Sequence, residues 1–275
     1  MTLEVTESQE LADIALLAAR AVGGRLREAF RERPAVRTKR DFHDPVTEHD
    51  TAAEETIREV IARHCPGSVV VGEERGALVA AEGDRAEITW YVDPIDGTAN
   101  FAAGVPFFSV SVAAAAGGEV VAGVVYDPLR EEEYVASLAG ARCGDEVLRS
   151  VGARGDREAM LLTSYPSPRD LAAEGEEALR RFGGLVESFA AVRRPGSAAL
   201  KLAHVAAGRA DAALGFRASP WDVAAGSLLV RQAGGVYLAL SGSVFEVGGY
   251  LAHVAGFDLG GSVLREMIPK NISMS

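Results

Sequence analysis

The 275-residue sequence predicts an α/β fold in which helices and sheets form the layers of a sandwich. Three observations support this fold class. Helical periodicity is found toward both ends of the chain, strand-like segments dominate its middle, and helix-like and strand-like segments alternate over the second half. The sequence shows no internal repeat and no linker of the kind that separates domains, so we expect a single domain over residues 1–275.

Two helices are predicted at the beginning of the chain. The second begins near Thr47, because Thr47 and Asp50 have the spacing of a capping box. Pro34 ends the first helix, and Pro66-Gly67 ends the second. The apolar face of the first helix comprises Leu11, Ile14, Ala15, Ala18, Val22, Leu26 and Phe30. The apolar stripe of the second comprises Ala53, Ile57, Val60, Ile61 and His64.

Strands are expected in the middle of the chain. Short β-branched or apolar runs predict them at 68–71, 88–92, 107–115, 120–126 and 133–137. The turn pairs Gly117-Gly118 and Asp127-Pro128 separate the last three runs. Since these connections are short, we expect an antiparallel meander.

The second half alternates between the two patterns. Helices are predicted at 169–182, 197–207 and 220–233, and strands at 210–214, 236–240 and 251–255. Asp258 is expected to cap a last helix.

Composition restricts the class of partner. The net charge is −11 and no basic stripe offsets it, so we expect neither nucleic acid nor an anionic membrane as a partner. Cys65 and Cys143 make no disulfide framework in a chain of this length, which favours reduced thiols and a cytoplasmic location. The N-terminal segment does not have the pattern of a signal peptide, and no apolar run is long enough to predict a membrane span.

Acidic residues gather in four segments that are predicted to be loops or element ends: 44–50, 72–74, 90–101 and 221–226. Asp93 and Asp96 stand three residues apart after a predicted strand, and Glu73 follows a strand that can lie beside it. Magnesium prefers about six oxygen ligands, among them a few carboxylates. These segments therefore suit a magnesium site that binds phosphate.

Each acid also has a structural explanation. Asp50 and Asp222 suit the third position of a capping box. Asp93 and Asp96 suit a tight turn, and Glu73-Glu74 suits a solvated loop. Spacing alone does not decide between these explanations and a shared site.

The segment DPIDGTANF at 93–101 closely resembles the signature of the inositol monophosphatase family. The resemblance covers nearly the whole chain and keeps the order of the family's motifs. The other similar segments are DPVTEHD at 44–50, GEE at 72–74, GVVYDPLREEEY at 123–134, PGSAALKLAHVAAGRADAAL at 195–214 and WDVAAG at 221–226.

The resemblance implies a fold and an activity. The fold would be a five-layer αβαβα sandwich, usually a homodimer, and we expect a metal-binding half at about 1–150 and a substrate-side half at about 151–275. The implied activity is Mg²⁺-dependent hydrolysis of a small phosphorylated metabolite, by direct attack of a metal-activated water without a covalent intermediate. Two or three Mg²⁺ ions per subunit and inhibition by lithium are implied as well.

The resemblance also implies metal ligands. Glu73, Asp93 and the backbone carbonyl of Ile95 match the ligands of a first ion. Asp93, Asp96 and Asp222 match those of a second, so that Asp93 would bridge the two. A weaker third ion is expected near Glu73.

Catalytic and substrate-binding residues follow from the same resemblance. Asp50 and Thr98 match the pair that orients and deprotonates the attacking water, and Glu73 counts with them as catalytic. Residues that match positions facing the phosphate or the alcohol portion of the substrate are Gly97, Thr98, Gly196, Ser197, Ala198 and Lys39.

One position departs from the family. Members that bind inositol use a glutamate seven residues before the aspartate of the WD motif, and here that position is Gly215. Phe216 and Arg217 would form a different pocket wall, which puts inositol 1-phosphate in doubt as the substrate. Histidinol phosphate, a 3′,5′-bisphosphorylated nucleoside and fructose 1,6-bisphosphate are the alternatives. We expect Gly215→Glu to raise activity on inositol monophosphate.

Four other residues have ambiguous positions. His43 and His49 flank an acidic motif and are interpreted as surface residues. Arg193 and Arg194 are interpreted as solvated, with contact to a second phosphate or a partner subunit as alternatives.

The composition of the segment from 76 to 87 would permit it to move over the site. A catalytically retired protein that binds a ligand or a partner is the competing hypothesis from another functional class.

Overall fold

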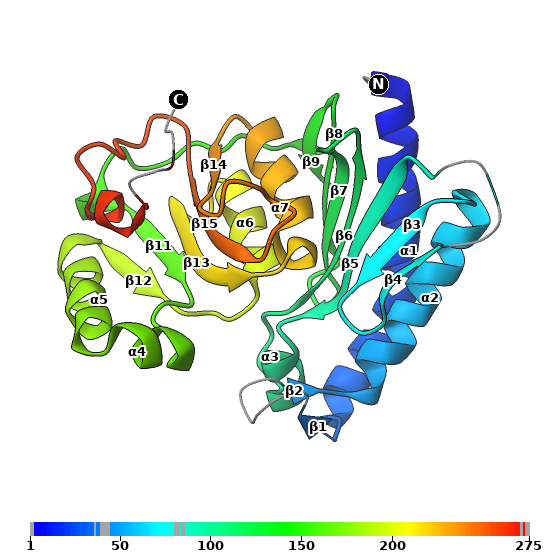
Figure 1. The fold of residues 1–275 in the computed structure, drawn as a ribbon, viewed down its shortest axis with the longest axis horizontal. Helices are drawn as coiled ribbons and strands as arrows, with labels where there is room; N and C mark the ends of the chain where they lie inside the picture. Colours follow the sequence, from blue (N-terminus) through cyan, green and yellow to red (C-terminus); the bar gives the residue numbers. More distant parts are fainter. Residues whose placement is uncertain are drawn as a thin grey trace.

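The computed structural model describes the chain except residues 1–2, 36, 39–44, 80–82, 84–85, 270–271 and 273–275. Its elements stack as five layers, α, β, α, β and α, along the longest axis of the molecule (Figure 1). The helical layers are α1 (Val5–Glu32) with α2 (Glu48–His64), then α6 (Ala198–Ala206) with α7 (Pro220–Gln232), and finally α4 (Pro168–Glu174) with α5 (Glu176–Ser188). The predicted fold class and its five-layer form are confirmed.

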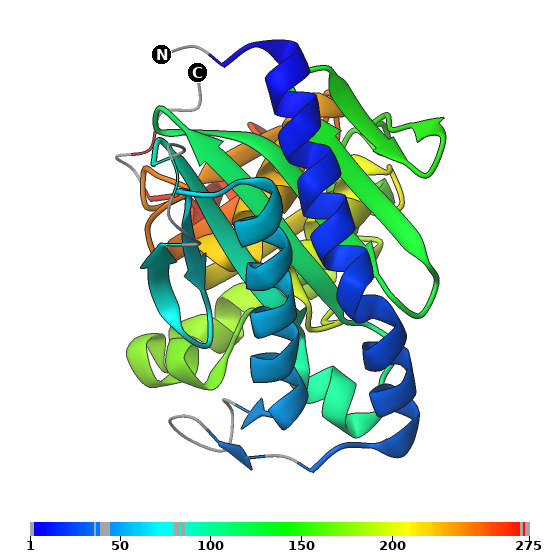
Figure 2. The ribbon, with the colours of Figure 1, turned by 90° about the vertical axis from the view of Figure 1, so that its right-hand side faces the viewer.

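The larger sheet lies between the α1–α2 layer and the middle layer. Its strand order is β10-β9-β8-β7-β6-β5-β3-β4. The strands from β5 to β8 form the predicted antiparallel meander, whereas β3 runs parallel to β5. Figure 2 shows α1 and α2 lying across one face of this sheet. Its strands are β3 (Val69–Gly72), β4 (Gly76–Val79), β5 (Ile88–Asp96), β6 (Ser109–Ala116), β7 (Glu119–Asp127), β8 (Glu132–Ser137), β9 (Gly140–Cys143) and β10 (Glu146–Val147).

The smaller sheet lies between the middle layer and the α4–α5 layer (Figure 1). Its order is β12-β11-β13-β15-β14, with β11 parallel to both neighbours and β15 antiparallel to both of its own. The strands are β11 (Met160–Thr163), β12 (Ala191–Arg193), β13 (Ala212–Ala218), β14 (Val236–Ala239) and β15 (Gly248–His253). The short elements are β1 (Arg37–Thr38), β2 (Pro45–Val46), α3 (Thr98–Ala103), η1 (Asp156–Glu158) and η2 (Val263–Met267).

Two helical predictions need correction. The helix predicted at 169–182 is two helices, because Gly175 adopts φ 61° and ψ −132° between α4 and α5. The last helix is the short 3₁₀ turn η2, and its N-cap is Ser262, whose hydroxyl accepts a hydrogen bond from the Leu264 N–H. Asp258 instead accepts a hydrogen bond from the Gly261 N–H in the preceding loop.

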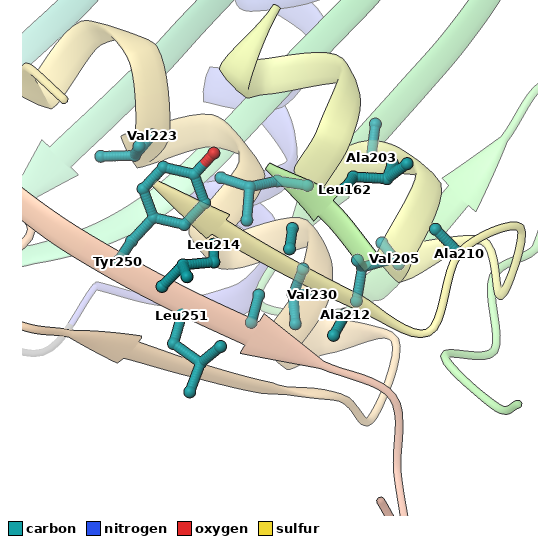
Figure 3. Close-up of a cluster of buried hydrophobic side chains, with 14 of the residues drawn as sticks. Leu162, Ala203, Val205, Ala210, Ala212, Leu214, Val223, Val230, Tyr250 and Leu251 are labelled. Atoms are coloured by element: carbon teal, nitrogen blue, oxygen red, sulfur yellow. The ribbon is translucent and has the colours of Figure 1, made fainter. Parts of the chain in front are cut away.

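Buried apolar residues form two clusters, one on each face of the larger sheet. The first joins α1 and α2 to this sheet and includes Trp90. The second surrounds α6 and α7 and extends to the smaller sheet (Figure 3). The middle layer therefore packs against apolar side chains of both sheets, and α7 is held rigidly between them.

Two further expectations concern the described part of the chain. Cys65 and Cys143 are free thiols, as expected. None of the helices in the described segments has the length and apolar character needed to cross a membrane.

Candidate metal centre and active site

The end of β5 carries two of the predicted acids. Asp93 lies opposite Ser111 of β6, and Asp96 lies opposite Ser109, so β5 has one residue more than its partner in this interval. In a regular strand, residues three apart point to opposite faces. The bulge with its extra residue turns Asp96 back to the side of Asp93, and both side chains line one cavity. Pro94 fits here because a bulge does not require its missing N–H donor.

Glu73 reaches the same place from β3. Gly72, the last residue of β3, pairs with Val92 in parallel register, and the Glu73 N–H donates to the Val92 carbonyl at 3.2 Å. The parallel pair therefore puts Glu73 beside Asp93, as the sequence predicted. The turn that follows is held by buried Glu54 of α2, which accepts hydrogen bonds from the backbone N–H groups that follow Glu73, at 2.7 and 3.2 Å.

A close approach explains the glycine at position 72. A Cβ placed on Gly72 would lie 2.4 Å from the Cδ atom of Glu54. Any larger residue would therefore displace the carboxylate that holds the turn after Glu73.

Asp222 comes from the first turn of α7. Its Oδ2 atom accepts the Ser219 N–H at 2.7 Å, so the predicted capping box is present. Ser111 of β6 donates to the Trp221 carbonyl at 2.8 Å and ties this helix start to the larger sheet. The capping-box explanation of Asp222 does not exclude a place at the cavity, because the residue both caps α7 and lines the cavity.

Three carboxylates form the cluster. Glu73, Asp93 and Asp222 each offer an oxygen within 4.8 Å of the other two. Burial, followed by the charges of neighbouring acids, raises the pKa values of Asp93 and Asp222 well above the ordinary range. Crowded carboxylates of this kind fit a hard divalent cation, which supplies the missing positive charge. The donor set therefore suits Mg²⁺.

Asp96 has different partners from the other three acids. Its oxygens accept hydrogen bonds from the Ser197 hydroxyl and from the N–H groups of Ala198 and Ala199, the latter two at 3.0 and 2.6 Å. Burial raises the pKa of Asp96, and these hydrogen bonds oppose the rise. The Asp96 carboxylate thus lies at the start of α6, outside the cluster of three. Its role as a metal ligand remains a prediction.

Thr98 and Asp50 form the expected pair. Thr98 Oγ1 lies 2.9 Å from Asp50 Oδ1 and 3.0 Å from the Ile95 carbonyl oxygen, and its single proton serves one of them at a time. Asp50 Oδ2 accepts hydrogen bonds from the N–H and hydroxyl of Thr47. Burial raises the pKa of Asp50, which makes its carboxylate a stronger base than an exposed one.

The site residues surround a cavity of about 330 Å³. Ser197 and Asp50 lie behind its wall and hold Asp96 and Thr98, respectively. The predicted residues that line the cavity are Glu73, Asp93, Ile95, Asp96, Gly97, Thr98, Gly196, Ala198 and Asp222. A larger cavity of about 670 Å³, near Asp156 and Asp258, contains none of them.

Some predictions fall on other parts of the chain. Lys39 and His43 lie outside the described residues, as does Asp44. Of the segment from 76 to 87, Gly76–Val79 forms β4, and five residues of the remainder lie outside the described part as well. The His49 ring packs edge-on against Phe101.

Two glycines shape the part of the cavity next to α3 and α6. Gly97 has φ 101° and starts α3, and Gly196 has φ 109° and precedes α6. A Cβ on Gly196 would lie 2.4 Å from Asn100 Nδ2, which donates to the Pro195 carbonyl at 2.6 Å. Asn100 of α3 therefore ties the loop before α6 to the segment DPIDGTANF at 93–101.

The sequence analysis missed three polar residues of the cavity wall, namely Lys201, Ser164 and Tyr250. Lys201 stands on α6 and is fully buried, and burial lowers its pKa to about 8. One signal was available, because Lys201 interrupts the otherwise apolar run AALKLA. Arg194 donates to the carbonyls of Ser164 and Pro166 at the edge of this wall, so it is exposed but not merely solvated.

The structure also corrects the expectation for Gly215→Glu. Gly215 of β13 pairs with Tyr250 of β15, and a Cβ on Gly215 would lie 2.5 Å from Tyr250 Cε1. Glutamate therefore does not fit at this position unless Tyr250 moves. The single substitution would disturb the pocket instead of restoring inositol recognition.

Known proteins resemble this chain over most of its length. A model described as the inositol monophosphatase family matches residues 7–268. The Nus factor SuhB of Pseudomonas aeruginosa is 40% identical over 237 residues, which cover 86% of this chain and 87% of that protein.

Solved structures show the same similarity. The inositol monophosphatase from Anabaena (Nostoc) sp. PCC 7120 has a TM-score of 0.78 and 31% identity, and the match covers 95% of this chain and 97% of that chain. Mycobacterium tuberculosis SuhB has a TM-score of 0.75 and 33% identity, covering 96% and 98%. Sequence and fold agree, and this chain belongs to the inositol monophosphatase family.

Proposed function

We propose that the protein is a Mg²⁺-dependent phosphomonoesterase that hydrolyses a small phosphorylated metabolite. The observation that carries this proposal is the convergence of Glu73, Asp93 and Asp222 within 4.8 Å of one another. The Thr98–Asp50 pair lies at the same cavity. Family membership supports the same class of reaction.

The metal ions would be held by residues from three elements. Glu73, Asp93 and Asp222 would provide carboxylate ligands, and the Ile95 carbonyl at the cavity wall would add a neutral oxygen. Magnesium bound there would neutralise the substrate phosphate and acidify a nearby water. Asp96 would join these ligands if its carboxylate turned away from the start of α6.

Thr98 and Asp50 would move the proton of the attacking water. The Thr98 hydroxyl can accept that proton while it donates its own to Asp50 Oδ1, 2.9 Å away. Thr47 keeps the other carboxylate oxygen fixed, so Asp50 presents Oδ1 to Thr98. The α3 start at Gly97 and the α6 start at Gly196–Ala198 line the cavity where phosphate and alcohol portions would lie.

The test is phosphate release from a panel of esters with Mg²⁺, with EDTA and with added lithium. The panel contains inositol 1-phosphate, histidinol phosphate, adenosine 3′,5′-bisphosphate, fructose 1,6-bisphosphate and para-nitrophenyl phosphate. We expect Mg²⁺-dependent turnover of at least one ester, and inhibition by lithium. Absence of turnover across the panel, in folded protein with excess Mg²⁺, would refute the proposal.

A second candidate function is suggested by the relatives named Nus factor SuhB, which are 36–40% identical to this chain. A protein of the same family that serves as a partner-binding factor would resemble this chain in sequence and fold. The carboxylate cluster and the Thr98–Asp50 pair favour the enzyme, since binding a partner does not require them.

A cytoplasmic location and a homodimer are part of the proposal, and analytical ultracentrifugation tests the homodimer.

A further inference from the structure

The cavity wall contains a second group of chemically active residues besides the acids. Lys201 of α6, Ser164 after β11 and Tyr250 of β15 line it together, and we call them the Lys201 corner. The neighbouring wall adds Phe216 and Arg217. This corner takes no part in the metal binding or proton transfer described above.

Lys201 is a buried cation with unused hydrogen-bonding capacity. Its exposed fraction is 1%, and its Nζ atom donates to Ser164 Oγ at 2.7 Å. Within the described residues it forms no ion pair with a carboxylate. The charges of Asp96 and Asp222 nevertheless raise the pKa of Lys201 and partly offset the effect of burial. An ammonium group has three donors, so two remain for a ligand or for solvent in the cavity.

Tyr250 presents a buried hydroxyl to the same corner. The residue is 1% exposed, and its hydroxyl has no hydrogen-bond partner among the described residues. Figure 3 shows this hydroxyl directed away from the aliphatic side chains of Leu214 and Leu251. Lys201 Nζ lies 5.8 Å from the centre of the Tyr250 ring. A buried hydroxyl without a protein partner is costly, so this hydroxyl is available to form a hydrogen bond with a molecule in the cavity.

The position of Gly215 explains why the corner is cationic. Tyr250 occupies the space into which a side chain at 215 would extend, so β13 contributes no carboxylate there. Arg217 is already bound to Asp170 of α4, which leaves that carboxylate occupied. The side chains available to the alcohol portion of a substrate at this wall are therefore mainly hydrogen-bond donors.

We propose that the Lys201 corner binds a second anionic group, a carboxylate or a second phosphate, carried by the alcohol portion of the substrate. This inference rests on the proposed phosphatase function, and it names the substrate class of the same site. An anion would accept hydrogen bonds from Lys201 Nζ and Tyr250 Oη and would satisfy both groups at once. A neutral polyol would accept hydrogen bonds from Lys201 but would bring no charge to complement the ammonium group. The cavity of about 330 Å³ favours a small molecule.

The experiment compares esters that differ only in the second anion. 3-Phosphoglycerate is paired with glycerol 3-phosphate, and fructose 1,6-bisphosphate with fructose 1-phosphate, so that the first pair tests a carboxylate and the second a phosphate. In the wild type, kcat/KM for the ester that carries the second anion should exceed that of its partner by about 10- to 100-fold in one of the two pairs. This is the range for a charge-assisted hydrogen bond. Lys201→Met should remove this preference, and the loss should be expressed in KM for the member that carries the second anion and not in kcat.

Two further variants separate recognition from structure. Tyr250→Phe removes only the unpartnered hydroxyl, so it should fold at least as stably and lose part of the preference. Arg180→Met, which removes an exposed cation on α5 that pairs with Glu177, should leave the preference intact. A Lys201→Met enzyme that loses kcat equally on all four esters, or keeps the wild-type preference, would overturn the inference. So would a wild type without preference in either pair.

Binding provides a readout that does not depend on turnover. In a Thr98→Val background with Mg²⁺, 3-phosphoglycerate should raise the melting temperature more than glycerol 3-phosphate does, or fructose 1,6-bisphosphate more than fructose 1-phosphate does. Adding Lys201→Met should remove the difference. If all esters, para-nitrophenyl phosphate included, resist hydrolysis while this Lys201-dependent shift persists, the proposed function fails and the anion site stands. If hydrolysis occurs and the shift does not depend on Lys201, the anion site fails alone.

Discussion

At the residue scale, Asp93 is the centre of the candidate site. Its carboxylate lies within 4.8 Å of those of Glu73, which follows β3, and Asp222 of α7. Burial together with neighbouring carboxylates raises the pKa of Asp93. The crowding that makes the cluster suitable for Mg²⁺ also makes it unfavourable in the absence of a cation. Activity and stability therefore place opposite demands on this residue.

Asp93→Asn should separate these two demands. We expect kcat/KM with Mg²⁺ to fall by about 100- to 1,000-fold or more, since a group that stabilises the reacting phosphate is lost. The melting temperature in EDTA should stay the same or rise, because one charge leaves the cluster. Asp258→Asn, in a surface turn, is the matched control. Wild-type turnover in Asp93→Asn would exclude the bridging role.

Thr98 offers a test of the proton path. Thr98→Val removes the hydroxyl that contacts Asp50 Oδ1 and should lower kcat by about 100- to 10,000-fold, the range for general acid–base catalysis. Thr98→Ser keeps the hydroxyl and should retain most of the activity. Equal losses in the two variants, measured by single-turnover phosphate release, would point to packing of the methyl group and not to proton transfer.

The sequence predicted the acids of the site but not the Lys201 corner. Asp93, Asp96 and Thr98 stand in one short motif, so their proximity follows from local spacing. Ser164, Lys201 and Tyr250 come from three distant segments, and no local pattern relates them. The Asp96 contacts with α6 were likewise not predictable, since they depend on how the middle layer docks on β5.

At the element scale, α2 controls the turn that carries Glu73. Buried Glu54 accepts the N–H groups of Glu74 and Arg75, and it also pairs with Arg58 on the same helix. The Glu54 carboxylate thus connects α2 to the turn after β3. The first N–H group that it accepts is that of Glu74, the residue after Glu73 of the carboxylate cluster.

Glu54→Gln should therefore weaken metal binding without touching a ligand. We expect a stability loss of about 1–3 kcal/mol, as for a buried hydrogen-bonding group left badly paired. The Mg²⁺ dissociation constant from calorimetric titration should also rise. Glu55→Gln changes an exposed neighbour in α2, which pairs with Arg75 at 3.5 Å, and should alter neither quantity. An unchanged Mg²⁺ affinity in Glu54→Gln would show that the turn does not position Glu73.

Sequence patterns found most elements and missed those whose length or position obscures the pattern. The long amphipathic helices and the meander were predictable because their apolar periodicity extends over several turns or strands. β11 and β12 are four and three residues long, too short for periodicity to distinguish them from loops. α4 and α5 were predicted as one helix because glycine does not by itself end a helical pattern.

At the scale of the whole molecule, the acidic site should link stability to pH and to Mg²⁺. Asp50, Asp93, Asp96 and Asp222 all have pKa values raised by burial, so the folded state binds more protons than the unfolded state above about pH 4. Stability in EDTA should therefore fall as pH rises through the raised pKa values. Three groups act in the opposite direction, because burial lowers their pKa values in the folded state. His204, with a pKa of about 4, and His253 do so below about pH 6.5, and Lys201, with a pKa of about 8, does so between about pH 8 and pH 10.5.

The corresponding measurement is the melting temperature at pH 5 and pH 7.5, in EDTA and in Mg²⁺. We expect the increase caused by Mg²⁺ to be larger at pH 7.5 than at pH 5, because the ligands are ionised at pH 7.5. In EDTA, the stability of the wild type relative to Asp93→Asn should fall between pH 5 and pH 7.5, since the histidines are the same in both proteins. A Mg²⁺ effect that is equal at both pH values would contradict this linkage.

The capping box that begins α7 has a consequence for the internal motions of the protein. Asp222 closes the first turn of the helix that packs against both sheets, and the same carboxylate belongs to the cluster with Glu73 and Asp93. An ion held by Asp222 would therefore reduce fraying of α7 at its first turn. Amide hydrogen exchange should slow along α7 when Mg²⁺ is added. The neighbours of this helix on β7 and β14 should exchange more slowly as well, far from any atom that touches the ion.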